Sequence, residues 1–511
     1  MTEPRRLAVI DLGSNSFRLV VFTYGEGWWK RTDEIHETVR IGEGLDASGE
    51  LGPEPIERAL QTLEMYAHFC RATGVTDIRP VATSAIRDAG NREDFLRATR
   101  ERSGLEVEVL TSEQEAWYGY VAAVNSTTLS DGVVLDLGGG SMQLSCVRDR
   151  RAEDLRSWPL GAVRMTERFL ARDRPKPKHL QALRDHVTGE LAEVPWLDGC
   201  LVGIGGTTRN LAAAAELQAG LPSFGVQGFA LRREALDALV ERLAELPAEE
   251  RGKVPGIKSG RGDLILAGAI VVQSVMELGR FDVLEATEAG LREGVFFATL
   301  LEGSDPPLFD DVRRASVDNL AVQYGSGHAH TAQVERLALA LWDGLGAAGC
   351  HDRDPREREL LSAAAALHDI GMSIDYDDHH KHSRYLVLSA GLPGFSPRET
   401  ALIGQMCRYH RKGSPSLGEV DGLAGKGDAG VLDRCAASLR IAEQLERARD
   451  QAVDDLELAV DGDVARLRLR AHDEITVGRW AAERQQDIFE HAFGLRLEIS
   501  AAPPGRPAAR R

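Results

Sequence analysis

Long apolar runs, paired cysteines and an excess of basic residues are all missing from this 511-residue sequence. The longest apolar stretches fall far short of the roughly 20 residues that a membrane-spanning helix needs. The first residues lead directly into an expected strand, without the pattern of a signal peptide. The six cysteines are scattered without CxxC spacing, so neither a disulfide framework nor a zinc cluster is indicated. We therefore expect a cytoplasmic protein with no membrane partner.

The sequence has fewer basic than acidic residues. It contains 61 lysines and arginines and 79 aspartates and glutamates, which gives a net charge of -18. A nucleic-acid partner requires a basic face, so we expect none. A polyanionic substrate requires local positive charge that overrides the global field. Residues 168–178 and 251–261 are basic enough to supply it, and a solvated loop is the alternative for each. The length itself predicts two to four domains.

Two glycine-containing turns of similar sequence each join two apolar segments. Asp-Leu-Gly-Ser-Asn-Ser occupies residues 11–16, and Asp-Leu-Gly-Gly-Gly-Ser occupies residues 136–141. Where Cβ atoms are absent, backbone N–H groups can close around an oxyanion, and the aspartate that ends each strand can hold a cation beside it. The repeat predicts a duplicated fold whose two loops face each other across a cleft that binds a phosphoanhydride and a divalent metal. The alternative is a pair of glycine-rich hairpins without a ligand.

Chemically useful side chains follow the ends of other expected strands. Arg87 comes just after the strand 78–83, where its planar fork suits phosphate. Thr111-Ser112 provides an N-cap before a helix that carries Glu113 and Glu115 in its first turn. A carboxylate there can activate water, and the alternative is an acidic residue that only interacts favourably with the helix dipole. The paired glycines before Thr207 open another helix and form a further anion-binding corner.

A break in the sequence at Ser304-Asp305-Pro306-Pro307 separates two kinds of pattern. Strands and helices alternate before it. After it come helix upon helix with separated histidines, and then a β-β-α-β segment with a Pro- and Arg-rich tail. We expect two α/β domains at 1–127 and 128–304, a helical domain at 310–450, a small α/β domain at 451–500 and a disordered tail at 501–511.

In combination, these motifs resemble the Ppx/GppA family of exopolyphosphatases and guanosine pentaphosphate phosphohydrolases, in the actin-like phosphotransferase superfamily. The resemblance implies an α/β fold of two duplicated actin-like (ribonuclease H-like) domains, followed by an all-α HD-like domain and a small α/β cap. It also implies release of the terminal phosphate from inorganic polyphosphate, or conversion of guanosine pentaphosphate to tetraphosphate. The residues that carry it are 11–16, 81–89, 112–116, 136–141, 203–207, 290–294, 368–371, 392–395 and 408–412.

The resemblance assigns roles within the cleft. The family's helix-start motif reads Glu-Glu-Ala with its second Glu as the catalytic base, and Gln114-Glu115-Ala116 keeps that Glu, so Glu115 is the expected base. The family's second loop carries a Glu two residues after its Ser, where this chain has Gln143, a departure that should weaken the metal site. Mg²⁺ is the expected metal, with Mn²⁺ or an added monovalent cation as alternatives. The expected metal-binding positions are Asp136, Asp11 and Gln143, and the expected phosphate-binding residues are Gly13, Ser14, Asn15, Ser16, Arg87, Gly138, Gly139, Gly140, Ser141, Gly206 and Thr207.

The histidines of the C-terminal part resemble the HD phosphohydrolase superfamily, whose domains bind a divalent metal through His, His, Asp and a late Asp. His330, His368, Asp369 and Glu443 follow this order, with Glu in the last position. They define either a second metal centre or a degenerate domain that serves dimerisation and substrate binding. We favour the second interpretation, with a homodimer and with Arg408, Arg411 and Lys412 facing polyphosphate.

Two other functions are compatible with the sequence. One is an actin-like ATPase or kinase, although no kinase-type sugar-binding segment is apparent. The other is a regulatory protein that binds an alarmone or polyphosphate with little turnover.

Overall fold

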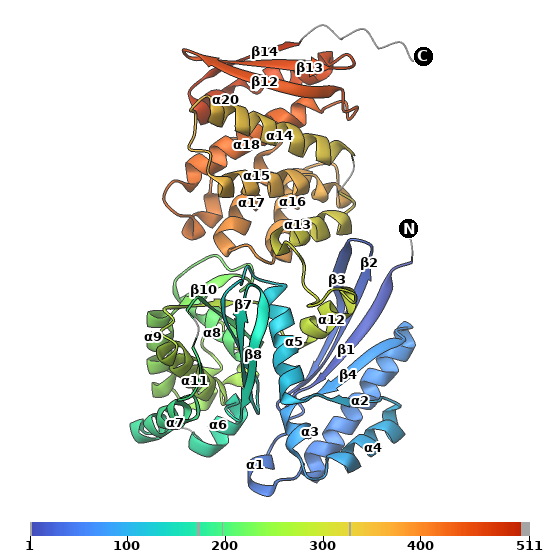
Figure 1. Cartoon of the computed structure of the whole chain (residues 1–511), viewed down its shortest axis with the longest axis vertical. Helices are drawn as coiled ribbons and strands as arrows, with labels where there is room; N and C mark the ends of the chain where they lie inside the picture. The colour runs from blue at the N-terminus through green and yellow to red at the C-terminus, as the bar shows by residue number, and fades with distance from the viewer. Residues whose placement is uncertain (1–2, 171–173, 197, 327–328, 502–511) are drawn as a thin grey trace. The chain divides into compact units, whose positions relative to one another are not determined.

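The computed structural model describes residues 3–170, 174–196, 198–326 and 329–501. It divides into two compact units, Met1–Val312 and Arg313–Arg511. Both mix helices and strands, so the chain is a mixed α/β protein (Figure 1). None of the described helices is long and apolar enough to cross a membrane.

The first unit begins with a five-stranded sheet in the order β3-β2-β1-β4-β5. The first three strands form an antiparallel meander, and β4 returns parallel to β1. The strands are β1 (Arg5–Leu12), β2 (Phe17–Gly25), β3 (Trp28–Glu37), β4 (Asp77–Ala82) and β5 (Glu108–Val109). The helices are α1 (Leu45–Ser48), α2 (Pro53–Thr73), α3 (Ser84–Asp88), α4 (Arg92–Ser103) and α5 (Ser112–Val124).

The second half of this unit repeats the arrangement. Its six-stranded sheet has the order β10-β11-β9-β6-β7-β8, so the meander β6-β7-β8 and the parallel return strand β9 match β1-β2-β3 and β4. This correspondence supports the predicted duplication. The strands are β6 (Gly132–Leu137), β7 (Met142–Arg148), β8 (Arg151–Trp158), β9 (Cys200–Ile204), β10 (Phe229–Arg232) and β11 (Val283–Ala286). The helices are α6 (Ala162–Phe169), α7 (Pro177–Glu190), α8 (Gly205–Gln218), α9 (Arg233–Glu245), α10 (Ala248–Arg251), η1 (Ser259–Arg261), α11 (Ile265–Leu278) and α12 (Leu291–Leu300).

The central strand β1 is apolar throughout because both of its faces are covered. Successive side chains of a strand point to opposite faces, and here Ala8 and Ile10 join the core of the first half while Leu7 and Val9 join a second core. That second core also holds residues of α5, α12, β6 and β9. The two halves are therefore joined through a shared hydrophobic layer, which fixes the loops at the ends of β1 and β6 relative to each other.

The second unit is helical and ends in a small sheet. Its helices are α13 (Val312–Gln323), α14 (Ala329–Ala347), α15 (Pro355–Leu367), η2 (Ile370–Ser373), α16 (His379–Ala390), α17 (Pro397–Tyr409), η3 (Gly418–Leu423) and α18 (Asp428–Leu445). The terminal part consists of β12 (Val453–Asp461), β13 (Val464–Ala471), α19 (Thr476–Glu483), α20 (Gln486–Phe493) and β14 (Arg496–Ala501), in the sheet order β12-β13-β14. The expected β-β-α-β order is present, with two helices in place of one.

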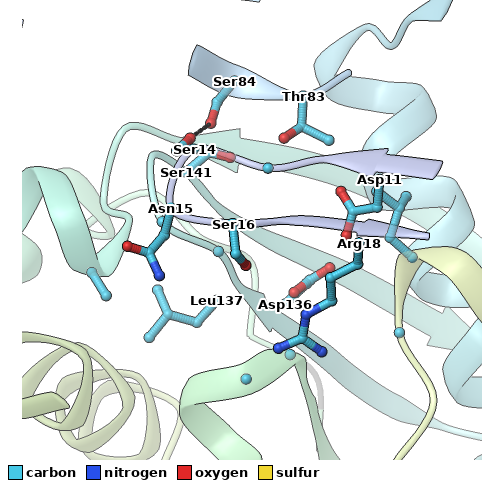
Figure 2. Close-up of a pocket in the computed structure, with 18 of the residues that line it drawn as sticks. Asp11, Ser14, Asn15, Ser16, Arg18, Thr83, Ser84, Asp136, Leu137 and Ser141 are labelled. Carbon is cyan, nitrogen blue, oxygen red and sulfur yellow. Dashed lines mark hydrogen bonds between the residues drawn. The ribbon is translucent and has the colours of Figure 1, made fainter. Parts of the chain in front are cut away.

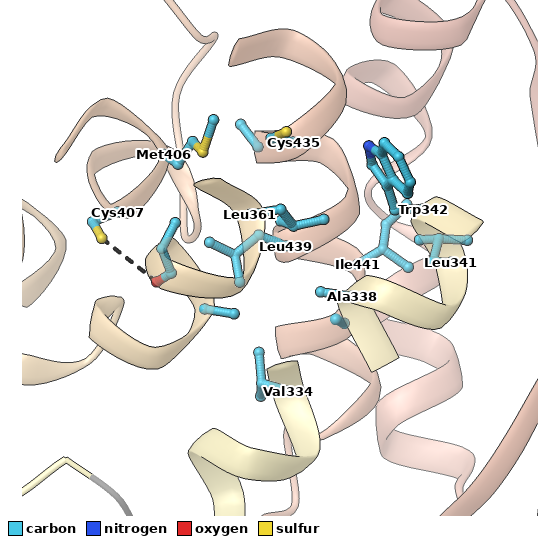
Figure 3. Close-up of a cluster of buried hydrophobic side chains, with 14 of the residues drawn as sticks. Val334, Ala338, Leu341, Trp342, Leu361, Met406, Cys407, Cys435, Leu439 and Ile441 are labelled. Atoms are coloured by element: carbon cyan, nitrogen blue, oxygen red, sulfur yellow. Dashed lines mark hydrogen bonds between the residues drawn. The ribbon is translucent and has the colours of Figure 1, made fainter. Parts of the chain in front are cut away.

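One hydrophobic core runs through this second unit. Leu341, Trp342 and Leu439 pack together between the helices (Figure 3), and Leu467 of β13 and Phe489 of α20 belong to the same cluster. The sheet thus covers the helices on a continuous core. The finer division into separate domains at 310–450 and 451–500 stays a prediction.

Candidate active site

A pocket in the first unit lies where the two glycine turns meet (Figure 2). Residues of both halves of the duplication line it, and they include the first residues of α3, α6, α8 and α12. Most of the residues expected in the cleft are among them. The lining includes Asp11, Gly13, Ser14, Asn15, Ser16, Glu115, Asp136, Gly138, Gly139, Ser141 and Gly206, together with Arg18, Thr83, Ser84, Gly205, Arg209, Arg261 and Arg292.

Glycine is required in the second turn because the first turn touches it. A Cβ atom on Gly139 would lie 3.2 Å from Ser14 Cβ, and one on Gly140 would lie 2.8 Å from Ser14 Oγ and against the Ser84 hydroxyl. Ser14 Oγ is itself 3.1 Å from Ser84 Oγ, within hydrogen-bonding distance. The hydroxyls of the first half and the bare backbone of the second half therefore form one continuous surface at this end of the pocket.

Glu115 is held in the pocket by the first turn of α5. Thr111 caps this helix reciprocally: its Oγ1 accepts from Gln114 N at 3.1 Å, and Gln114 Oε1 accepts from Thr111 N at 2.8 Å. Glu115 Oε2 accepts a hydrogen bond from Arg87 Nη1 at 2.8 Å, and Oε1 lies 3.4 Å from the donating Ser141 Oγ. Burial raises the pKa of Glu115, and the positive charge of Arg87 opposes that rise. Glu115 is therefore a buried carboxyl group whose charged form is favoured by one arginine.

Gln143 contacts the site through Ser141. Its Nε2 donates to Ser141 Oγ at 2.8 Å and to Ser157 Oγ at 3.2 Å, while its Oε1 is buried without a hydrogen-bond partner among the described residues. The side chain is 1% exposed and is not part of the pocket lining that the structure describes. We expected Gln143 at the metal, and that role stays a prediction; the structure shows its amide donating to the Ser141 hydroxyl, which lies next to Glu115.

The two strand-ending aspartates both line the pocket. Burial raises the pKa of Asp11, which the charges of Arg292 and Arg18 partly offset. Burial and the nearby carboxylates of Glu115 and Asp11 together raise the pKa of Asp136 to about 7. Carboxylate oxygens that crowd one another in this way are the ligands that a hard divalent cation prefers. The residues present therefore fit a divalent metal ion.

Four arginines line the pocket and give it positive charge; we call them the arginine wall. They are Arg18, Arg209, Arg261 and Arg292. Burial and the charge of Arg292 lower the pKa of Arg209 to about 10, and burial together with Arg209 does the same for Arg261. Arg18 projects from β2, and the guanidinium of Arg261 lies so close to Gly206 that a Cβ there would collide with it. Local positive charge of this kind overcomes the net charge of the chain and attracts a polyanion.

Sequence reasoning missed most of this wall. The stretch 251–261 was a candidate for substrate contact and Arg261 belongs to it, but Arg18, Arg209 and Arg292 were not singled out. A signal existed, since each of these three follows a glycine-containing turn by only a few residues. Conversely, Arg87, Gly140 and Thr207 were expected at phosphate and lie outside the described lining. The other basic stretch gives no support, because Arg168 pairs with His186 and residues 171–173 lie outside the described part of the chain.

The histidines of the second unit also gather. His330 Nε2 lies 3.1 Å and His368 Nε2 lies 3.2 Å from Glu443 Oε2, and both lie 3.7 Å from carboxylate oxygens of Asp369. The four residues expected to form a second metal centre are thus in contact. Of the basic group, Arg411 stacks over Tyr376 and Lys412 pairs with Asp378 at 3.3 Å.

A duplicated α/β unit with two facing glycine turns, a buried carboxylate and an arginine wall has the groups that a phosphohydrolase requires. Comparison with known families makes the assignment specific. The model described as "Ppx/GppA phosphatase family" matches residues 20–302, and "Ppx/GppA phosphatase, domain III" matches residues 312–493. The chain belongs to the Ppx/GppA phosphatase family.

Individual relatives agree with this assignment. A protein of Vibrio vulnificus named guanosine-5'-triphosphate,3'-diphosphate pyrophosphatase is 28% identical over 496 residues, covering 94% of this chain and 96% of that protein. Among solved structures, a Ppx/GppA family member of Aquifex aeolicus is 31% identical, with a TM-score of 0.52, and the match covers 58% of this chain and 98% of that one. An exopolyphosphatase-like protein is 27% identical, with a TM-score of 0.53 over 57% of this chain and 97% of that one.

Proposed function

We propose that the first unit hydrolyses the terminal phosphoanhydride bond of inorganic polyphosphate or of guanosine pentaphosphate. The observation that carries the proposal is the position of Glu115, a buried carboxylate between two anion-binding turns and opposite an arginine wall. The names of the relatives, a guanosine-5'-triphosphate,3'-diphosphate pyrophosphatase and an exopolyphosphatase-like protein, point to the same two substrates.

In this mechanism the terminal phosphoryl group lies against the backbone N–H groups of residues 13–16 and 138–141. Glu115 accepts a proton from a water molecule that attacks the terminal phosphorus in line with the leaving oxygen. The bond from phosphorus to the bridging oxygen breaks, and the shortened chain leaves with that oxygen. Arg209 and Arg261 offset the negative charge of the remaining phosphates. The charge of Arg87 favours the ionised form of Glu115, and Ser141 Oγ donates to its Oε1.

Asp136 and Asp11 would hold Mg²⁺, the hard cation that their oxygens suit. When bound, the ion neutralises charge on the phosphate oxygens. Mn²⁺ and an added monovalent cation are the alternatives. Gln143 contributes indirectly, because its amide donates to Ser141.

The second unit, in this proposal, is an HD-like helical domain with a small α/β cap that extends the grip on long substrates and joins two protomers. Arg408 and Arg411 of this unit are half-buried and Lys412 is exposed, and we expect this basic group to face polyphosphate. The same proposal includes the expected domains at residues 1–127, 128–304, 310–450 and 451–500. It also includes the expectation that the protein does not bind nucleic acid.

A side-by-side assay of phosphate release from polyphosphate, guanosine pentaphosphate and ATP tests the proposal. We expect fast release from one or both of the first two and slow release from ATP. Preferential ATP hydrolysis would favour an actin-like ATPase. Tight binding of guanosine pentaphosphate or polyphosphate with background release would favour a regulatory protein.

A further inference from the structure

Arg164 connects the two halves of the first unit behind the glycine turns. It lies at the start of α6, where its backbone N and that of Val163 donate to Gly139 O at 3.3 Å and 2.8 Å. Its side chain reaches into the other half, because Nε lies 3.2 Å from Asp46 Oδ1 and Nη2 donates to Asp88 Oδ2 at 3.1 Å. The residue is therefore held by its backbone on the second turn and by its side chain on α1 and α3.

The position of Arg164 excludes a direct contact with a phosphate in the pocket. The side chain is half-buried, whereas Asp46 and Asp88 are exposed. It belongs, with Ser14 and Gly140, to the described lining of a small cavity behind the turns, and not to the described lining of the pocket itself. Any part that Arg164 takes in hydrolysis must therefore act through other residues.

Asp88 links Arg164 to the proposed base. Asp88 Oδ1 lies 3.6 Å from Arg87 Nε, and Arg87 Nη1 donates to Glu115 Oε2 at 2.8 Å. Arginines and carboxylates thus alternate along a chain of four charges, which begins with Arg164 in the second half and ends with Glu115 in the pocket. Within this chain, Arg87 is shared by two carboxylates.

The two carboxylates compete for Arg87 on unequal terms. The Glu115 side chain is 8% exposed and that of Asp88 is 40% exposed, so Glu115 depends more on a neighbouring cation for its negative charge. With Arg164 in place, Asp88 already has a guanidinium at 3.1 Å. Without it, one guanidinium would have to serve both carboxylates, and Glu115 would lose part of its only strong ion pair in the described structure.

We propose that Arg164 is a positioning residue for the hydrolysis proposed above, on which this inference rests. Its pair with Asp88 leaves the charge of Arg87 to Glu115, and its pair with Asp46 holds the guanidinium in place between the two halves. Arg164 therefore acts on the step in which Glu115 takes a proton from water. Its replacement should lower kcat and leave KM nearly unchanged.

Paired substitutions test the proposal through the kinetics of phosphate release from tripolyphosphate and guanosine pentaphosphate. Arg164→Met should lower kcat about three- to fivefold, the range expected for groups coupled in one ion-pair network. Adding Asp88→Asn removes the competing carboxylate and should restore most of the lost kcat. Adding Asp46→Asn instead is the matched control, because Asp46 lies outside the chain of charges, and it should restore nothing. Arg168→Met, one turn further along α6 where the side chain pairs with His186 of the same half, should behave as the wild type.

The pattern among the variants separates positioning from a structural role, because the loss of a second contact does not repair a structural defect. If folded Arg164→Met/Asp88→Asn is no more active than Arg164→Met, the proposal is overturned and Arg164 is a structural link. Equal recovery with Asp46→Asn would overturn it in favour of a general effect of local charge. A higher KM with unchanged kcat would assign Arg164 to substrate binding.

Two further results remain decisive. Arg164→Gln, with and without Asp88→Asn, repeats the comparison if Arg164→Met does not fold. No phosphate release by the wild type would refute the proposed function and this inference with it. That result is distinct from a failure of the inference alone, which is seen as the wrong pattern among variants of an active enzyme.

Discussion

Arg87 Nη1 lies 2.8 Å from Glu115 Oε2, and the same nitrogen donates to Leu110 O at 3.1 Å. An arginine just beyond a strand end is typical of a phosphate-binding residue, and the sequence predicted that role. That role stays a prediction, and the structure shows the Arg87 guanidinium in contact with the carboxylate of the proposed base. Burial raises the pKa of Glu115 and the charge of Arg87 opposes that rise, so this contact favours the ionised form that can accept a proton.

Glu115→Gln should abolish turnover while leaving binding and melting temperature near those of the wild type. The amide oxygen can still accept from Arg87, but it cannot take a proton from water, so we expect a loss of about 10²–10⁴-fold in kcat. Phosphate-release kinetics and a binding titration measure the two effects. Glu113→Gln, two residues earlier and exposed, is the control. Activity within a few-fold of the wild type would remove Glu115 from the role of base.

Arg87→Gln should shift the pH profile of kcat. The positive charge of Arg87 lowers the pKa of Glu115, so its removal should raise that pKa and move the acidic limb of the profile to higher pH. At neutral pH we expect a loss of roughly tenfold, which recovers as the pH rises. Arg97→Gln, on an exposed part of α4, should leave the profile unchanged. A uniform loss at every pH would show that Arg87 binds substrate instead.

Gln143→Glu should lower the magnesium concentration needed for half-maximal activity. Gln143 is paired with Asp136 across β6 and β7, so a carboxylate there adds negative potential close to the proposed ion. Gln143→Met removes the hydrogen bond to Ser141 without adding charge, and it should lower kcat with little effect on the magnesium requirement. Magnesium titrations of the three proteins make the comparison. An unchanged or higher requirement in Gln143→Glu would place the residue out of electrostatic reach of the ion.

The metal-free protein should lose stability as the pH rises from about 4 to 7. The pKa of Asp136 is about 7 in the folded protein and 3.8 as its ordinary value, so in this window the native state holds a proton that the unfolded chain has released. Stability then falls with increasing pH, by up to about 4 kcal/mol for this group. Thermal unfolding of chelator-treated protein measures it, and Asp136→Asn should have a flatter profile. Identical slopes in the two proteins would contradict the assignment.

A chain that ends after Val312 should keep hydrolysis of short substrates and lose affinity for long polyphosphate. The segment before this point belongs to the first unit, where Asn125 Nδ2 donates to Pro307 O at 2.9 Å and Trp29 stacks on Phe309, so an end near Ser304 would remove part of its core. Relatives that match only 58% of this chain match over 98% of their own length, which supports independent folding. Affinity should fall because fewer phosphates are gripped at once. Loss of activity on short substrates in a folded, shortened chain would contradict this.

Local signals predicted much of the scaffold. The glycine turns after residues 11 and 136 sit between apolar segments that could only be buried strands, and Thr111 with Gln114 forms the cap that places Glu115. The four arginines of the pocket were not predicted as a group. Alternation along β2 shows on which face of the sheet Arg18 lies, but it does not show that the other half of the duplication supplies the opposite side of a pocket. Likewise, His379 and His380 are neighbours in sequence, and only the position of α16 turns the first toward Asp369.

The sequence by itself determined the family, the duplicated pattern of turns and strands, and the residue types available for chemistry, since these depend on periodicity and spacing within short segments. Tertiary structure alone decided which side chains meet. That Arg87 pairs with Glu115 and that several histidines lie near Asp369 both depend on contacts between segments far apart in the chain. Such contacts are set by the packing of whole elements on shared cores, and no local pattern encodes them.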